Sequence, residues 1–162
     1  MSIHTFLAQD HARLDTLLRR SVADPNVIDR EAYKEFRAGL LRHIAMEEKV
    51  LLPDARHRRG GDPLPVAAQL RSDHGILATL LVPTPTHASV ELLAKFLEEH
   101  NELEEKAGGL YATCDQLVGS EAEAVLARLR AVPEVRVAPH FDGPRVHAQI
   151  AELLRQRWNS DK

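Results

Sequence analysis

Apolar residues recur at every third or fourth position along almost the whole chain, and no segment alternates strictly between apolar and polar residues. A spacing of three and four gathers side chains on one face of an α-helix, whereas a half-buried strand requires a period of two. The chain has 162 residues, a length that favours one domain with a single core. The sequence therefore predicts an all-α fold.

Turn residues divide the chain into six predicted helices. Gly and Pro clusters or a loss of the apolar period end each of them. Asp62-Pro63 is expected to cap the third helix, and Ser120 with Glu123 to form a capping box for the fifth. Gly108-Gly109 is expected to loosen the fourth. The predicted helices begin near residues 2, 29, 62, 86, 120 and 144 and end near residues 21, 59, 82, 118, 129 and 158.

Four of these helices are long and are joined by short connections, which predicts an antiparallel up-down-up-down four-helix bundle. We assign residues 1–118 to this bundle. Residues 119–162 are expected to add a short helix, an irregular segment and a C-terminal helix that packs on or beside the bundle.

Composition excludes several classes of protein. The net charge is −3 and the longest basic run is only residues 56–59, so a nucleic-acid groove is disfavoured. Cys114 is the single cysteine, which excludes an internal disulfide framework and a CxxC site. The first residues do not read as a signal peptide, and no run of 18 apolar residues occurs, so we expect a cytoplasmic protein without a membrane span.

A duplicated motif organises the chain. The segment DHARLDTLL at residues 10–18 returns as DHGILATLL at residues 73–81, with six of nine positions identical. A second pair follows, HIAMEEK at residues 43–49 and HNELEEK at residues 100–106. The order DH, HxxxEEK, DH, HxxxEEK predicts two helical hairpins related by a pseudo-twofold axis.

Six polar residues of this repeat fall in the apolar stripes, where a core is expected. A His and a Glu four residues apart lie one turn apart on the same helix face, so their donor atoms can converge. Two buried carboxylates cost several kcal/mol each unless a cation accompanies them. The six residues are His11, His43, Glu47, His74, His100 and Glu104.

Four imidazoles and two carboxylates suit two first-row metal ions better than one, because one ion rarely takes six protein ligands. Nitrogen and oxygen donors of this kind fit iron, manganese or zinc and disfavour calcium or magnesium. The alternative is a buried network of His–Glu hydrogen bonds without metal.

With these spaced motifs, the sequence resembles the hemerythrin-like, HHE cation-binding family over about residues 3–118. The resemblance implies a left-handed antiparallel four-helix bundle with a non-haem diiron centre. It implies that the six residues named above are the ligands, with Glu47 and Glu104 bridging the ions. Iron is implied by the resemblance, and manganese or zinc are the alternatives.

Two positions depart from the oxygen-carrying members of that family. Those proteins have a second histidine where this chain has Ala78, and an aspartate where it has Glu105. We prefer Glu104 as the ligand because it copies the spacing of the first half. Ala78 is expected to lie beside the ion and leave a gap for an exogenous ligand. Tyr111 has two interpretations, a residue near the metals or a plain core tyrosine, and the pattern favours the second.

Three functions remain open. The first is a protein that binds or senses oxygen, nitric oxide, redox state or iron through an open coordination position. The second is an enzyme that activates dioxygen or decomposes peroxide. The third is a metal-stabilised helical module, for which a protein partner or a second copy would bind through the C-terminal helix.

Overall fold

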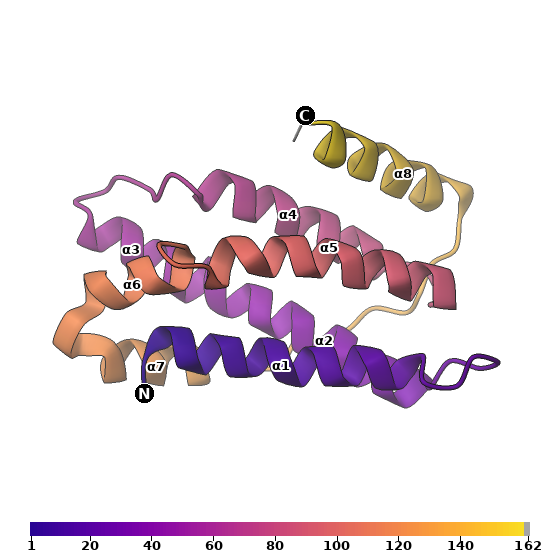
Figure 1. Ribbon diagram of the computed structural model, residues 1–162, viewed down its shortest axis with the longest axis horizontal. Coiled ribbons are helices and arrows are strands. Elements are labelled where there is room, and N and C mark those ends of the chain that lie inside the picture. Colours follow the sequence, from indigo (N-terminus) through magenta and orange to yellow (C-terminus); the bar gives the residue numbers. More distant parts are fainter. Residues whose placement is uncertain (161–162) are drawn as a thin grey trace.

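The computed structural model describes residues 1–160, and in this part of the chain all regular secondary structure is helical (Figure 1). The predicted all-α class is confirmed. The elements are α1 (Ile3–Ser21), α2 (Arg30–Met46), the π-helix η1 (Glu47–Leu51), α3 (Leu52–Arg58), α4 (Ala67–Leu80), α5 (His87–Glu105), α6 (Leu110–Val118), the 3₁₀-helix η2 (Gly119–Glu121), α7 (Ala122–Arg130) and α8 (Pro144–Asn159).

The four helices α1, α2, α4 and α5 lie alongside one another, with α1 packed on α2 and α5, and α4 on α5 (Figure 1). Each of them passes between two apolar clusters. Along α1, Leu7 belongs to the first cluster and Leu14 to the second, whereas along α2 Leu40 belongs to the second and Met46 to the first. In the same way, α4 runs from the first cluster to the second, and α5 runs from the second back to the first. Successive helices therefore run in opposite directions, and a polar layer lies between the clusters.

The second predicted helix is almost continuous, because α2 runs through η1 into α3. The fourth is not. Gly108 adopts φ 73°, a left-handed conformation that favours glycine, and the chain breaks between α5 and α6. A Cβ on Gly109 would meet the carbonyl oxygen of Leu103 at 2.8 Å, so the turn folds tightly against the end of α5. The glycine pair does not merely loosen a helix but ends it.

Both predicted caps are wrong. The third helix begins at Ala67 instead of Asp62, and Pro65 disfavours the α conformation at Leu64, directly before it. The short helix α7 has Glu121 at its N-cap and no side-chain hydrogen bond there, because the 3₁₀-helix η2 leads directly into it. A capping box does form between Thr86 and Ser89 at the start of α5.

The C-terminal helix α8 packs on α4 and lies above α4 and α5 in Figure 1. An extended segment, residues 133–143, carries the chain back to it along the bundle. Phe141 N donates to Val82 O at 3.0 Å, and Arg37 donates to Ala138 O at 2.7 Å, which fixes this segment to the loop after α4 and to α2. None of the helices within residues 1–160 has the length and apolar character needed to cross a membrane.

Candidate metal centre

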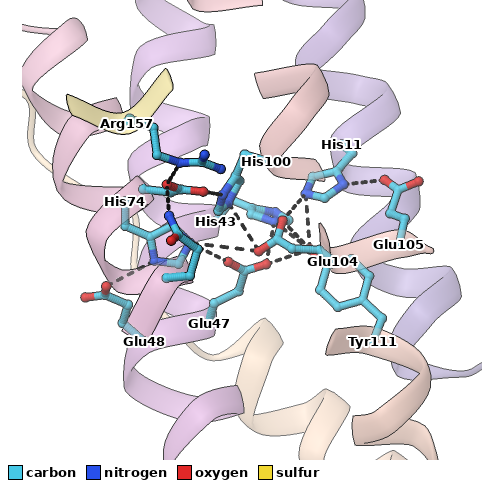
Figure 2. A network of polar contacts seen from close by, with 12 residues as sticks. His11, His43, Glu47, Glu48, His74, His100, Glu104, Glu105, Tyr111 and Arg157 are labelled. Atoms are coloured by element: carbon cyan, nitrogen blue, oxygen red, sulfur yellow. Dashed lines mark hydrogen bonds and ion pairs between the residues drawn. The ribbon is translucent and has the colours of Figure 1, made fainter. Parts of the chain in front are cut away.

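The polar layer between the two apolar clusters contains all six predicted site residues. Each of α1, α2, α4 and α5 places one histidine there, and η1 and α5 add one glutamate each (Figure 2). Their donor atoms form two groups in which every atom lies within 4.8 Å of the others. The groups are His11, His43, Glu47 and Glu104, and Glu47, His74, His100 and Glu104. We call them the first and the second position.

Glu47 belongs to both positions. Its Oε1 lies 3.1 Å from His43 Nε2, and its Oε2 lies 3.0 Å from His74 Nε2. The residue is fully buried at the point where α2 turns into η1. A π-turn within an α-helix is often found at functional sites. The two oxygens of this carboxylate thus face opposite halves of the repeat.

Glu104 repeats this arrangement from α5. Its Oε1 lies 3.3 Å from His11 Nε2, and its Oε2 lies 3.3 Å from His100 Nε2. It is also fully buried, whereas Glu105 points outward to the far side of His11 (Figure 2). Both glutamates therefore span the two positions, which is the geometry of bridging carboxylates.

A second layer of carboxylates surrounds the histidines. In every one of the four, Nε2 faces the centre and Nδ1 donates to an acidic side chain outside it. Such a hydrogen bond fixes the ring orientation and raises the basicity of the inner nitrogen. The outer pairs are His11 with Glu105, His43 with Asp10 at 2.8 Å, His74 with Glu48 at 3.0 Å, and His100 with Asp73 at 3.1 Å.

The sequence pattern did not predict this outer layer of carboxylates, although the repeat contains the signal. Asp10 and Asp73 are the D of each DH pair, and Glu48 and Glu105 are the second E of each EEK. Helix geometry explains why the acidic and ligand residues of the repeat stand next to each other in the sequence. One member of each pair faces the centre, and its neighbour, about 100° round the helix, meets a histidine of another helix.

Charge in the centre is balanced between histidines and glutamates. Burial acts to lower the pKa of the histidines, but the surrounding carboxylates raise the pKa of His43 and His74 to about 10 and that of His100 to about 9. Burial acts to raise the pKa of Glu47 and Glu104, yet their histidine partners hold it below its usual range. Protons and a metal cation therefore compete for the same donor atoms.

The donor atoms fit a cation at the second position. Within residues 1–160, three buried atoms of this group lack a hydrogen bond, namely Oε2 of Glu47, Oε2 of Glu104 and Nε2 of His74. The donor atoms of this group lie within 4.8 Å of one another, close enough for one first-row ion, with metal–nitrogen distances of about 2.0–2.1 Å, to contact them all. The three buried atoms lie 3.0–3.9 Å from oppositely charged neighbours without a well-directed hydrogen bond, and a shared cation would satisfy all three.

Tyr111 lies in the centre, so the preferred interpretation of it as a plain core residue is wrong. Its hydroxyl donates to Glu47 Oε1 at 2.6 Å and lies 3.1 Å from His11 Nε2 and 3.2 Å from His43 Nε2. Burial raises its pKa well above 10, so the phenol is a neutral donor. It enters from α6, after the glycine break, and contacts the first position (Figure 2).

Ala78 does not lie beside the centre. It is exposed, and Leu77, fully buried, takes the inward direction one turn after His74. The inward residues of α4 advance by four and then by three, from Leu70 to His74 to Leu77, as in helices packed along a 3.5-residue seam. The fourth residue after His74 therefore leaves the seam. The explanation of an open coordination position by a missing side chain at 78 is wrong.

Comparison with known families agrees with this geometry. A family model for the hemerythrin HHE cation-binding domain matches residues 2–107, the segment that contains all six residues. This chain belongs to the hemerythrin HHE family. No curated protein and no solved structure matches it. The HHE match ends before α6, so Tyr111 and α8 lie outside the matched segment.

Proposed function

We propose that this HHE domain is an antiparallel four-helix bundle that holds two metal ions and binds or senses a small molecule there. Iron is the metal that the family resemblance favours. One observation carries the proposal. Glu47 and Glu104 each direct one carboxylate oxygen to the first position and the other to the second, so both positions share both carboxylates.

In this proposal, His11 and His43 complete the first position, and His74 and His100 complete the second. Two histidines and two shared carboxylates leave each ion with room for an exogenous ligand. A bound first-row ion supplies Lewis acidity and, if it is iron, access to two oxidation states. The protein orients the imidazoles through the outer carboxylates and keeps bulk water out of the layer.

Elemental analysis of the protein reconstituted anaerobically with Fe²⁺ tests the metal proposal. Two ions per chain are expected. The visible spectrum before and after reduction, and after addition of nitric oxide or azide, tests the ligand proposal. A content of one ion or none would contradict the shared-carboxylate centre, and two ions with spectra insensitive to both ligands would contradict a binding or sensing role.

A second candidate, a diiron enzyme, is favoured by a groove between α1 and α5. The groove has a volume of about 960 Å³ and reaches His11 and Glu105 at the edge of the first position. Ala8, Ala12 and Ala94 contribute only small side chains to it, and Leu14, Leu18 and Val90 contribute an apolar surface. This volume lies within the range of small-molecule sites and exceeds what a diatomic ligand requires.

Steady-state consumption of oxygen and peroxide separates the two candidates, because a sensor binds these molecules without sustained turnover. Ala12→Trp narrows the groove from an exposed position, and Ala78→Trp is a matched exposed alanine away from it. The enzyme candidate predicts that only the first substitution slows turnover of a bulky co-substrate while nitric oxide still binds. If both substitutions slowed turnover equally, the groove would have no part in the reaction.

A further inference from the structure

The C-terminal helix α8 packs on the second apolar cluster through one buried leucine and three partly buried apolar residues, Ile150, Leu153 and Trp158. Leu154 is its one buried residue within the described part of the chain. Trp158 adds a hydrogen bond from its indole N–H to Glu99 at 2.8 Å and stacks beneath the Lys95 ammonium, 4.2 Å from the ring centroid. The segment before α8, residues 133–143, has no regular structure. Docking of α8 therefore depends on a small number of side chains.

One of these contacts reaches the candidate metal centre. Arg157 Nε donates to Asp73 Oδ1 at 2.8 Å, and Asp73 Oδ2 accepts from His100 Nδ1 at 3.1 Å. The inner nitrogen of His100 lies in the second position. Asp73 has no exposed surface, and the Arg157 side chain is only 10% exposed. A buried chain of charges thus connects α8 with the second position.

The pseudo-twofold counterpart lacks such a connection. Asp10 supports His43 in the first position as Asp73 supports His100, but its arginine partner is Arg13 of its own helix, one turn away. The Asp10 side chain is 15% exposed and Arg13 is 50% exposed, so water reaches this pair. Asp73 is fully buried and its Arg157 partner comes from α8, 84 residues later in the sequence.

We propose that α8 is a metal-responsive element, in which Arg157 couples docking of the helix to occupancy of the second position. The inference rests on the proposed function, because it requires an ion at His74 and His100. A cation there would be bound by the inner nitrogen of His100, whose ring orientation is fixed by the outer hydrogen bond to Asp73. Arg157 in turn holds the buried Asp73 carboxylate in place for that hydrogen bond. By linkage, metal binding favours docked α8 to the same extent that docked α8 favours metal binding.

Zn²⁺ titration tests the coupling without any redox chemistry. The wild type is expected to bind two ions. Arg157→Gln is expected to weaken one of the two by up to about tenfold, the lower end of the effect of losing a direct outer partner, because Arg157 acts on His100 through Asp73. Arg157→Lys is expected to restore part of this loss. Arg155→Gln is the matched control on the same helix, because Arg155 pairs with Glu152 on the surface. Arg13→Gln is the control in the first position.

Hydrogen exchange of the α8 amides measures the other side of the coupling. In the wild type, Zn²⁺ is expected to slow exchange over residues 144–159 by about the factor by which Arg157→Gln weakens Zn²⁺ binding. In Arg157→Gln, Zn²⁺ is expected to change this exchange little. Unchanged affinity for both ions in Arg157→Gln, or equal exchange with and without Zn²⁺ in the wild type, would overturn the inference. An equal loss of affinity in Arg155→Gln would also overturn it, because Arg157 would then have no special role.

The two proposals fail in different ways. If the wild type takes up no Zn²⁺ and no Fe²⁺, the proposed dimetal function fails and the coupling with it. If two ions bind, but neither the Arg157 variants nor the exchange of α8 responds, only the coupling fails.

Discussion

The α1–α2 pair, with η1, and the α4–α5 pair each bring two histidines and one glutamate to the centre, at matching positions of the repeat. They differ in what surrounds these residues. At the first position the Tyr111 hydroxyl lies against Glu47, His11 and His43. At the second position no such hydroxyl is present among the described residues, and the three buried atoms without a hydrogen bond all face it.

The halves also differ outside the centre. The first position borders an open groove between α1 and α5, and its outer carboxylate Asp10 is partly exposed. The second position lies under α8, and its outer carboxylate Asp73 is sealed by Arg157. The comparison teaches that a duplicated motif sets which donors are present, while the segments after the repeat determine how each copy is used. We expect the first position to exchange ligands and the second to communicate with α8.

The largest effect is expected from the residues that the two halves share. Glu47→Ala removes a carboxylate from both positions and is expected to abolish stable binding of both ions. Glu48→Ala removes only the outer partner of His74 and is expected to weaken one ion by about tenfold to a hundredfold. Metal content after dialysis measures both. Equal content in the two variants would contradict the assignment of Glu47 as the shared ligand.

The next effect is on the pH dependence of the metal-free protein. The pKa of His43 and His74 is raised to about 10 and that of His100 to about 9. Groups with a raised folded pKa stabilise fully below the unfolded value, about 6.5, and this contribution is lost as pH rises through 9 and 10. The free energy of unfolding in urea should therefore fall over this window. With Zn²⁺ bound, the histidines are neutral ligands and the fall should be absent.

The same pH argument sharpens the comparison, because the protonated histidines belong to both halves. NMR titration of the imidazole resonances in the metal-free protein should find high pKa values for His43 of the first half and for His74 and His100 of the second. A metal-free protein whose stability is flat between about pH 6.5 and 10 would contradict the charged network.

A smaller effect is expected from the glycine turn that gives the first position its tyrosine. Gly109→Ala brings a Cβ to within 3.0 Å of three backbone carbonyl oxygens and should destabilise the protein by about 1–3 kcal/mol. Gly75→Ala is the matched control, because it lies within α4 with no atom within 4 Å and should stabilise by about 0.5–1 kcal/mol. Thermal unfolding of both variants measures this. Destabilisation by Gly75→Ala alone would contradict the tight turn.

The smallest effect is expected at Ala78. Because this residue is exposed, a histidine placed there should leave metal content, azide spectra and stability unchanged. The position that matches it in the first half, Asp15, is exposed as well. Tighter iron binding by Ala78→His would show that α4 can turn this residue toward the second position, and would restore the missing ligand as the reason for an open site.

Much of the centre followed from local pattern alone. His43 and Glu47 stand four residues apart in an apolar stripe, and so do His100 and Glu104. The helical period carries such residues to one face wherever the helix packs. The stripe on α4 advances from Leu70 by four residues to His74 and then by three to Leu77, which explains why Ala78 faces away from the centre. A constant step of four residues had predicted the opposite.

Other features depended on contacts between distant segments. The sequence by itself determined the all-α class, the repeat and the six converging polar residues, because these arise from spacing within single helices. Only the tertiary structure decided that Tyr111 enters the first position, that Arg157 meets Asp73, and that the groove opens beside His11. Those contacts join residues of different helices, in two cases more than sixty positions apart in the chain. They depend on how helices tilt and dock, which no local period encodes.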